Sequence, residues 1–178
     1  MQHDKLFCKL HACNGVDGLL LQWIMNLFSN RTFCSRVNEM LAAVVKLISG
    51  VIQGSVIGPL MFLIYINDLI VLLSQYNIKL KLFDDDVNDV KLYVKILNNI
   101  DYVVLQEALS ALATLADEWQ LSVSIDKCGV LYVGRGVCSA PKQFKLHDCP
   151  LPIVSSYRDL GITITSDLAP STHINNIV

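Results

Sequence analysis

The sequence predicts an α+β domain in which an antiparallel sheet carries its helices on one face. Apolar residues recur at helical spacing in some segments and alternate with polar residues in others, and the two kinds of segment follow one another along the chain. Composition agrees, because apolar residues make up 53% of the 178 positions and charged residues only 17%. Such a chain must bury a core and is not disordered.

Helical spacing first occurs in residues 19–28, and residues 32–45 are mixed and could pair as strands. Residues 50–54 form a loop that begins and ends with glycine. Ser55 is then a good N-cap for an apolar segment that runs to about residue 73. Its apolar side chains crowd too many faces for a surface helix, so we expect it to be mostly buried beneath the following strands: Met61, Phe62, Ile64, Tyr65 and Leu69.

The apolar period changes to two between residues 78 and 96. Residues 78–83 and 91–96 each alternate, and the polar run 84–89 separates them. Two alternating segments around a polar turn predict a β-hairpin with Phe83 and Leu92 on its paired strands.

Helical spacing returns in residues 105–121, where one apolar stripe includes Leu105, Leu109, Leu112, Leu115, Ala116 and Trp119. Three short strands are expected after this helix because apolar runs stand between glycine and proline residues. They cover residues 130–133, 144–146 and 160–164.

The high apolar content raises the question of a membrane protein. The longest uninterrupted apolar stretch runs only from Val56 to Ile66 and is followed by Asn67 and Asp68, whereas a span needs about 20 apolar residues. We therefore expect no membrane partner. The first residues lack the layout of a secretory signal, and the six cysteines show no Cys-x-x-Cys spacing. These features predict an intracellular protein of the cytoplasm or nucleus that is not secreted.

Three adjacent carboxylates, Asp84, Asp85 and Asp86, stand at the expected hairpin tip. They repel one another unless a cation neutralises them, and oxygen ligands of this kind suit Mg²⁺. Taken alone, such a cluster is more often a solvated acidic turn. An EF-hand is excluded, because Asp89 stands where that loop requires glycine and Lys95 where it requires a bidentate glutamate.

Two further motifs are weak when taken singly. Residues 50–59, Gly-Val-Ile-Gln-Gly-Ser-Val-Ile-Gly-Pro, join glycines that allow close backbone approach to a helix N-terminus that favours phosphate. Glycine and serine before a helix are usually only a cap. Residues 157–162, Tyr-Arg-Asp-Leu-Gly-Ile, are typical of a turn into a strand. The order of these motifs along one chain is more informative than any of them.

In that order the motifs resemble the reverse transcriptases of non-LTR (LINE-type) retrotransposons. Residues 50–69 resemble the motif before the catalytic hairpin, and Lys-Leu-Phe-Asp-Asp-Asp at 81–86 resembles the Tyr/Phe-Ala-Asp-Asp box. Residues 116–121 with Asp-Lys-Cys at 126–128 are similar to the helix and lysine motif that follows, and Leu-Gly at 160–161 to the primer-grip turn. The resemblance covers nearly the whole chain.

The resemblance implies an RNA-directed DNA polymerase, a nucleotidyltransferase that uses Mg²⁺ as cofactor and an RNA template, a DNA primer and deoxynucleotides as partners. It implies that Asp85 and Asp86 are the catalytic carboxylates and metal ligands, Asp85 more directly. It also implies that Lys127 is a general acid near the leaving pyrophosphate. Residues expected against template, nucleotide or primer are Gln53, Gly54, Ser55, Leu160 and Gly161.

The implied architecture is a partial polymerase palm, an antiparallel sheet with helices packed on one face. It would span residues 1–178, with the palm in 1–150 and a primer-grip-like hairpin and the start of the thumb connection in 151–178. The family's first catalytic aspartate lies a few residues upstream of the segment that resembles residues 3–6. We therefore expect a chain truncated at the N-terminus and inactive by itself.

Three positions depart from the family pattern. Asp84 replaces a small residue, Val87-Asn88-Asp89 resembles an insertion, and Ile52 replaces a proline. The alternative interpretation is a non-catalytic protein- or nucleic-acid-interaction module derived from such a domain. A net charge of −2 gives this chain no basic footprint for nucleic acid.

Overall fold

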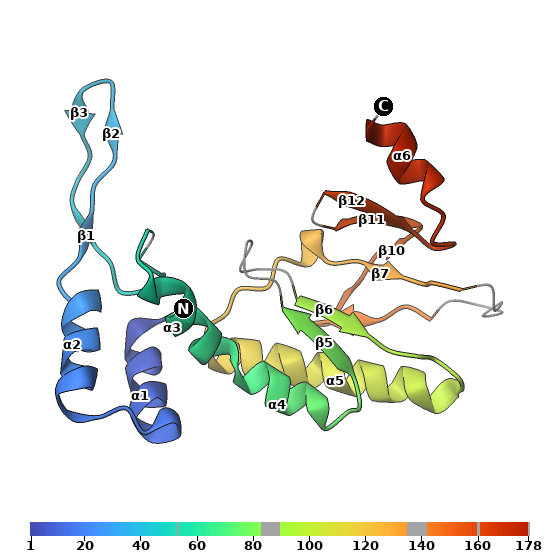
Figure 1. Cartoon of the computed structure of the whole chain (residues 1–178), viewed down its shortest axis with the longest axis horizontal. Coiled ribbons are helices and arrows are strands. Elements are labelled where there is room, and N and C mark those ends of the chain that lie inside the picture. The colour runs from blue at the N-terminus through green and yellow to red at the C-terminus, as the bar shows by residue number, and fades with distance from the viewer. Residues whose placement is uncertain (53, 83–89, 135–141, 160, 178) are drawn as a thin grey trace. The chain divides into compact units, whose positions relative to one another are not determined.

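The computed structural model describes residues 1–52, 54–82, 90–134, 142–159 and 161–177, which mix helices with short strands (Figure 1). They form two compact units. The first comprises Met1–Tyr93 with Leu115–Leu121, and the second comprises Val94–Thr114 with Ser122–Val178. Helices beside antiparallel hairpins confirm the predicted α+β class.

The first unit opens with α1 (His3–Asn14), a helix that the sequence did not predict. Its buried positions are His3, Leu6, Lys9 and Leu10. Histidine and lysine therefore occupy half of its inner face, which hides the helical period from a search for apolar residues. The helix ends at Gly15, which adopts φ +62° and closes a left-handed C-cap.

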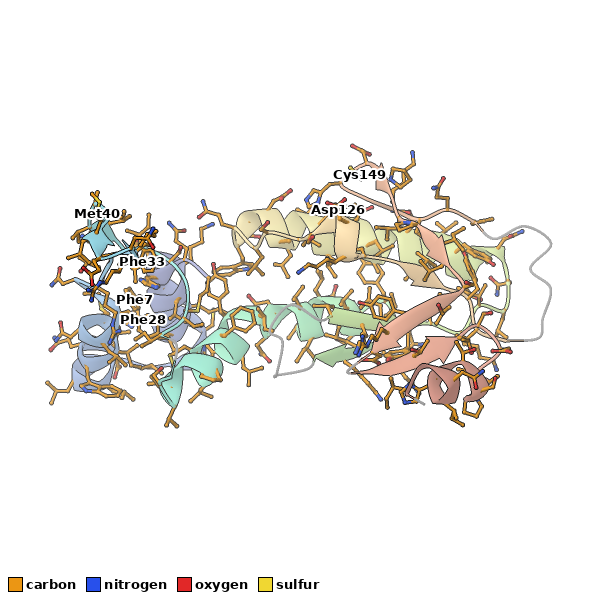
Figure 2. All side chains as sticks on the ribbon, turned by 90° about the horizontal axis from the view of Figure 1, so that it is seen from above. Phe7, Phe28, Phe33, Met40, Asp126 and Cys149 are labelled. Carbon is orange, nitrogen blue, oxygen red and sulfur yellow. The ribbon has the colours of Figure 1, made fainter. Side chains whose placement is uncertain are left out.

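The predicted second helix is confirmed as α2 (Gly18–Phe28), which buries Ile24 and Phe28. The Phe28 ring meets the rings of two α1 residues edge-on, with centroids 6.3 Å from Phe7 and 5.0 Å from His3. Figure 2 shows Phe7 and Phe28 together beside the two helices. This aromatic cluster joins α1 to α2 through dispersion and edge-to-face contacts.

A β-ribbon follows α2 and confirms the strand pairing expected in residues 32–45. Its outer turn has Asn38 and Glu39 at positive φ, 47° and 66°, as a type I′ turn requires. Most of its side chains are exposed, Phe33 and Met40 among them (Figure 2). The pairs are antiparallel: β1 (Thr32–Phe33) with β4 (Val45–Lys46), and β2 (Arg36–Val37) with β3 (Met40–Leu41).

The apolar segment after Ser55 forms α3 (Ile57–Ile66) and α4 (Asp68–Ser74), with Asn67 between them. The expectation that this segment is mostly buried is wrong. Its strongest burial follows one stripe with a step of four residues, because only one side packs on the unit: Met61, Tyr65, Leu69 and Leu73. Four apolar side chains on the remaining surface are between 41% and 57% exposed: Leu60, Leu63, Ile70 and Val71.

The continuous segment Ile57–Ser74 is long and apolar enough to cross a membrane by length and composition alone. One such segment is weak evidence, because the core helices of water-soluble proteins pass the same test. Lys9 of α1 places its ammonium 2.9 Å from Asp68 Oδ2 in the middle of this segment. An ion pair at that position favours a protein-packed helix over a lipid-exposed one.

The predicted hairpin is confirmed as β5 (Lys79–Leu82) paired antiparallel with β6 (Val90–Tyr93). In its register Leu80 faces Leu92, and Lys81 faces Lys91. α4 contacts β5, and the buried side chains of Leu73 and Ile78 stand at the two ends of the link between them. Phe83 and the connection 84–89 lie outside the described residues.

The second unit contains most of α5 (Asn99–Glu118), which confirms the helix predicted at 105–121. Near the start of α5, the Tyr102 ring stacks on Phe144 at 5.9 Å. One turn later the Gln106 amide donates to the Lys145 carbonyl and accepts from its N–H, at 3.0 and 2.9 Å. Buried residues of this unit include Ala108, Leu109, Leu112, Ala113, Phe144, Leu146 and Leu151.

Three short strands of the second unit lie close to those predicted, at residues 130–131, 145–146 and 162–165. The other three were not predicted, and the six described strands pair two by two. One pair is parallel, β7 (Val130–Leu131) with β10 (Ile153–Val154). The antiparallel pairs are β8 (Lys145–Leu146) with β9 (Cys149–Pro150), and β11 (Ser156–Asp159) with β12 (Ile162–Thr165). A 3₁₀ turn, η1 (Ile125–Lys127), and a helix, α6 (Ser171–Ile177), complete the unit.

Candidate functional site

The glycine loop is closed onto the start of α3 by Ser55. The Ser55 hydroxyl donates to the Ile52 carbonyl at 2.8 Å and accepts from the Gly58 N–H at 3.0 Å. A Cβ on Gly58 would lie only 2.9 Å from the Ile52 oxygen, so this approach requires glycine. Gly54 adopts φ +77°, the left-handed region that glycine enters without strain. Ser55 therefore caps the helix as predicted, and Gln53 lies outside the described residues.

A cavity of about 250 Å³ adjoins this loop and was not foreseen from the sequence. His3 is 8% exposed, and its Nε2 lies 3.1 Å from the Gly50 carbonyl oxygen. That contact requires a proton on Nε2, because a carbonyl only accepts. The lining residues are His3, Arg31, Leu47, Ser49, Gly50, Val51 and Ile52.

The two predicted metal ligands, Asp85 and Asp86, lie outside the described residues. The register of β5 and β6 nevertheless makes residues 83–89 the connection between two paired strands. Lys79 and Lys81 occupy β5 and Lys91 occupies β6, so cations flank the acidic connection on both sides.

The donor set of that connection fits a hard divalent cation such as Mg²⁺. Its carboxylates supply only oxygen ligands, which is the ligand type that Mg²⁺ takes. Within the part of the chain that the structure describes, no group of three or more His, Cys, Asp or Glu residues is placed to hold a metal ion. The acidic connection therefore stays the candidate metal site by sequence.

Lys127 is the last residue of η1 in the second unit, and its side chain is exposed. Its N–H donates to the Ser124 carbonyl at 3.1 Å, which closes the 3₁₀ turn. The neighbouring Cys128 thiol donates to the same carbonyl at 3.3 Å, and burial raises the pKa of this thiol. The turn fixes the backbone of Lys127 and leaves its side chain exposed.

Gly161 lies in the turn between β11 and β12. Asp159 pairs with Ile162, so only two residues connect the strands. Gly161 adopts φ +85°, which a tight hairpin turn requires and which side chains with a Cβ disfavour. The predicted turn is confirmed, while Leu160 lies outside the described residues.

The structure thus brings some predicted residues into one unit and not others. Gly54, Ser55 and the strands of the acidic hairpin belong to the first unit, in which α3 and α4 connect them. Lys127 and Gly161 belong to the second unit. The grouping of all of them around one reaction centre stays a prediction.

Comparison with known proteins agrees with the order of these motifs. Residues 1–164 match the family described as reverse transcriptase (RNA-dependent DNA polymerase). The RNA-directed DNA polymerase from mobile element jockey of Drosophila melanogaster is 25% identical over 159 residues, which are 86% of this chain and 17% of that protein. The protein of the same name from Drosophila funebris is 24% identical over 163 residues, 89% of this chain and 18% of that protein. The chain therefore spans less than a fifth of the length of these relatives.

Proposed function

Because the chain belongs to the reverse transcriptase (RNA-dependent DNA polymerase) family, we propose that it forms the palm of an RNA-directed DNA polymerase from a non-LTR retrotransposon. One observation carries this proposal. A closed glycine loop, a helix and an antiparallel hairpin with an acidic connection follow one another within one compact unit. This is the order in which a polymerase palm needs a nucleotide-facing loop and its metal-binding carboxylates.

Asp85 and Asp86 would hold the Mg²⁺ ions, with Asp85 the more direct ligand. Bound there, Mg²⁺ would neutralise charge on the transferred phosphoryl group.

The other predicted residues would orient the substrates. The closed loop of Gly54 and Ser55, with Gln53, would lie against template and deoxynucleotide, because its glycines let the backbone approach a ligand. The turn at Leu160 and Gly161 would hold the end of the DNA primer. By the family resemblance, Lys127 would give a proton to the leaving pyrophosphate, as a general acid.

The proposed arrangement divides these tasks between a palm at residues 1–150 and a primer-grip-like hairpin at residues 151–178. An RNA template, a DNA primer and deoxynucleotides would be its partners. Such partners place its action inside the cell, in the cytoplasm or nucleus.

The 178-residue chain by itself is proposed to lack polymerase activity. Only two adjacent carboxylates, Asp85 and Asp86, match the family's metal ligands. One adjacent pair cannot fix the separation of two metal ions, and positioning supplies most of the catalysis in phosphoryl transfer.

A second candidate function rests on the exposed apolar surface. Leu60, Leu63, Ile70 and Val71 lie on α3 and α4, and Val56 before α3 is 98% exposed. Exposed apolar patches mark interaction sites in soluble proteins. A non-catalytic interaction module would use this surface in place of the metal site.

Mn²⁺ binding separates the two functions, and primer extension tests the expected lack of polymerase activity. The purified chain is mixed with primed RNA, deoxynucleotides and Mg²⁺, and Mn²⁺ binding is followed in parallel by electron paramagnetic resonance. We expect no extension, but saturable Mn²⁺ binding that Asp85→Asn abolishes. Extension that Asp85→Asn abolishes would show that the third ligand lies within this chain. Binding that Asp85→Asn leaves unchanged would favour the interaction module.

A further inference from the structure

The least expected polar group in the described part of the chain is the ammonium of Lys9. This side chain is 2% exposed, although lysine is almost never fully buried unless it is paired. Its Nζ donates to the Tyr65 carbonyl at 2.7 Å and lies 2.9 Å from Asp68 Oδ2. It also lies 4.9 Å from the centre of the Trp119 ring. The carbonyl, the carboxylate and the π face together satisfy the buried charge.

These contacts meet at the corner between α3 and α4. Tyr65 is in the last turn of α3, where carbonyls lack helical partners and a cation is favoured. Asp68 is the first residue of α4. One ammonium therefore holds the end of α3 and the start of α4 together.

The same face of α1 also holds the end of α5. Lys5, one turn before Lys9, donates to the Glu118 carbonyl in the last turn of α5. The Tyr65 hydroxyl donates to the Trp119 carbonyl just beyond it. The corner between α3 and α4 is thus bound to α1 and to the end of α5, and Lys9 is at its centre.

Stability alone does not account for a buried lysine here. An apolar side chain of similar volume often serves as well as a buried ion pair, or better, because desolvation offsets the Coulomb attraction. The ion pair adds a fixed direction, since the ammonium must reach the carbonyl, the carboxylate and the ring face at the same time. The orientation of α4 in turn places the hairpin, because α4 begins at Asp68 and contacts β5.

We propose that Lys9 is a positioning residue for the acidic hairpin: it fixes the α3–α4 corner and thereby the place of β5, from which the connection with Asp85 begins. This inference rests on the proposed metal-binding function of that connection. It assigns to α1 an indirect role in metal binding, exerted through the corner and β5.

The test uses the full 178-residue chain with Mn²⁺ as the probe. Lys9→Met keeps the length of the side chain and removes its charge. Mn²⁺ affinity should fall by up to about tenfold, the lower end of the effect of removing a group that bonds a metal ligand directly, because Lys9 acts through β5. Amide hydrogen exchange in residues 79–82 and 90–93 should become faster. Lys9→Arg keeps the charge and should recover most of the affinity.

Phe28→Leu is the matched control. Phe28 is fully buried in the same unit but packs on the aromatic cluster, away from the corner. Like Lys9→Met, Phe28→Leu should lower the thermal midpoint of unfolding. Unlike Lys9→Met, it should leave Mn²⁺ affinity unchanged. If the two substitutions changed Mn²⁺ affinity and amide hydrogen exchange in β5 and β6 equally, the proposal would be overturned.

Two further outcomes are informative. If Lys9→Met does not fold, Asp68→Asn decides, because the Asp68 side chain is 37% exposed and its replacement should disturb the packing less. Unchanged Mn²⁺ affinity in Asp68→Asn would then overturn the proposal. If the Asp85→Asn chain binds Mn²⁺ as well as the unsubstituted chain does, the proposed metal function fails. The rate of amide hydrogen exchange in residues 79–82 and 90–93 of Lys9→Met then decides whether Lys9 positions the hairpin.

Discussion

Replacing Tyr65 with phenylalanine should lower the free energy of unfolding by about 2 kcal/mol. Tyr65 is 1% exposed, and its hydroxyl donates to the Trp119 carbonyl and accepts from the Gln2 N–H at 3.4 Å. Phenylalanine keeps the edge-to-face contact with the Trp119 ring at 5.5 Å. The loss is therefore confined to a carbonyl left without its donor, which costs about 1–3 kcal/mol. The Gln2 contact is long and adds little.

Urea unfolding measures this change. A Trp23→Phe background leaves Trp119 as the single fluorescent reporter, next to the substituted side chain. The midpoint should fall at unchanged slope, because the surface exposed on unfolding stays the same. Tyr76→Phe removes the same oxygen from a half-buried ring and should have little effect. A Tyr65→Phe chain as stable as the Tyr76→Phe control would refute the assigned hydrogen bond.

The same substitution should change the response to alkaline pH. Burial raises the pKa of Tyr65 above the ordinary value of 10.0. The folded chain therefore favours the neutral phenol, and this contribution is complete below pH 10 and is lost as the pH rises through the raised pKa. Stability of Tyr65→Phe should decline less steeply above pH 10 in the same urea assay. An identical slope would contradict the burial of the phenol.

Two other predictions concern the second unit. Gly161→Ala should destabilise the chain by about 1–2 kcal/mol in urea unfolding, because φ +85° strains a residue with a Cβ. Gly129→Ala is the control, since a Cβ there meets only ordinary contacts, and equal losses would refute the turn geometry. Cys128 should be alkylated by iodoacetamide at pH 8 more slowly than the exposed Cys149, because burial raises the pKa of its thiol. Peptide mass spectrometry follows both rates, which should converge as the pH rises; equal rates at pH 8 would contradict the burial.

The sequence predicted those elements whose signals are local. Alternation alone identified β5 and β6, and helical spacing identified α2 and α5. Ser55 and Gly161 were placed correctly as a cap and a turn residue, because capping and positive φ depend on the few residues around them. The family resemblance was likewise contained in the order of short motifs, and the family match over residues 1–164 confirms it.

Burial could not be predicted in the same way. The apolar segment of α3 and α4 was expected to be buried on most faces, but it buries chiefly one stripe. Apolar content is a property of the segment, whereas burial depends on how many neighbours the tertiary structure supplies. α1 shows the converse. Its residues are polar on average, which gave no sign that the Lys9 side chain is buried.

The sequence by itself determined the α+β class, the hairpin strands and the glycine loop, because each depends on spacing within a short stretch of chain. It also determined the family of this protein, because the family's motifs follow one another in a fixed order along the chain. Only the tertiary structure decided that Lys9 is buried at the α3–α4 corner. That placement brings together residues 9, 65, 68 and 119, and a charge can be buried only where distant segments supply its partners at once.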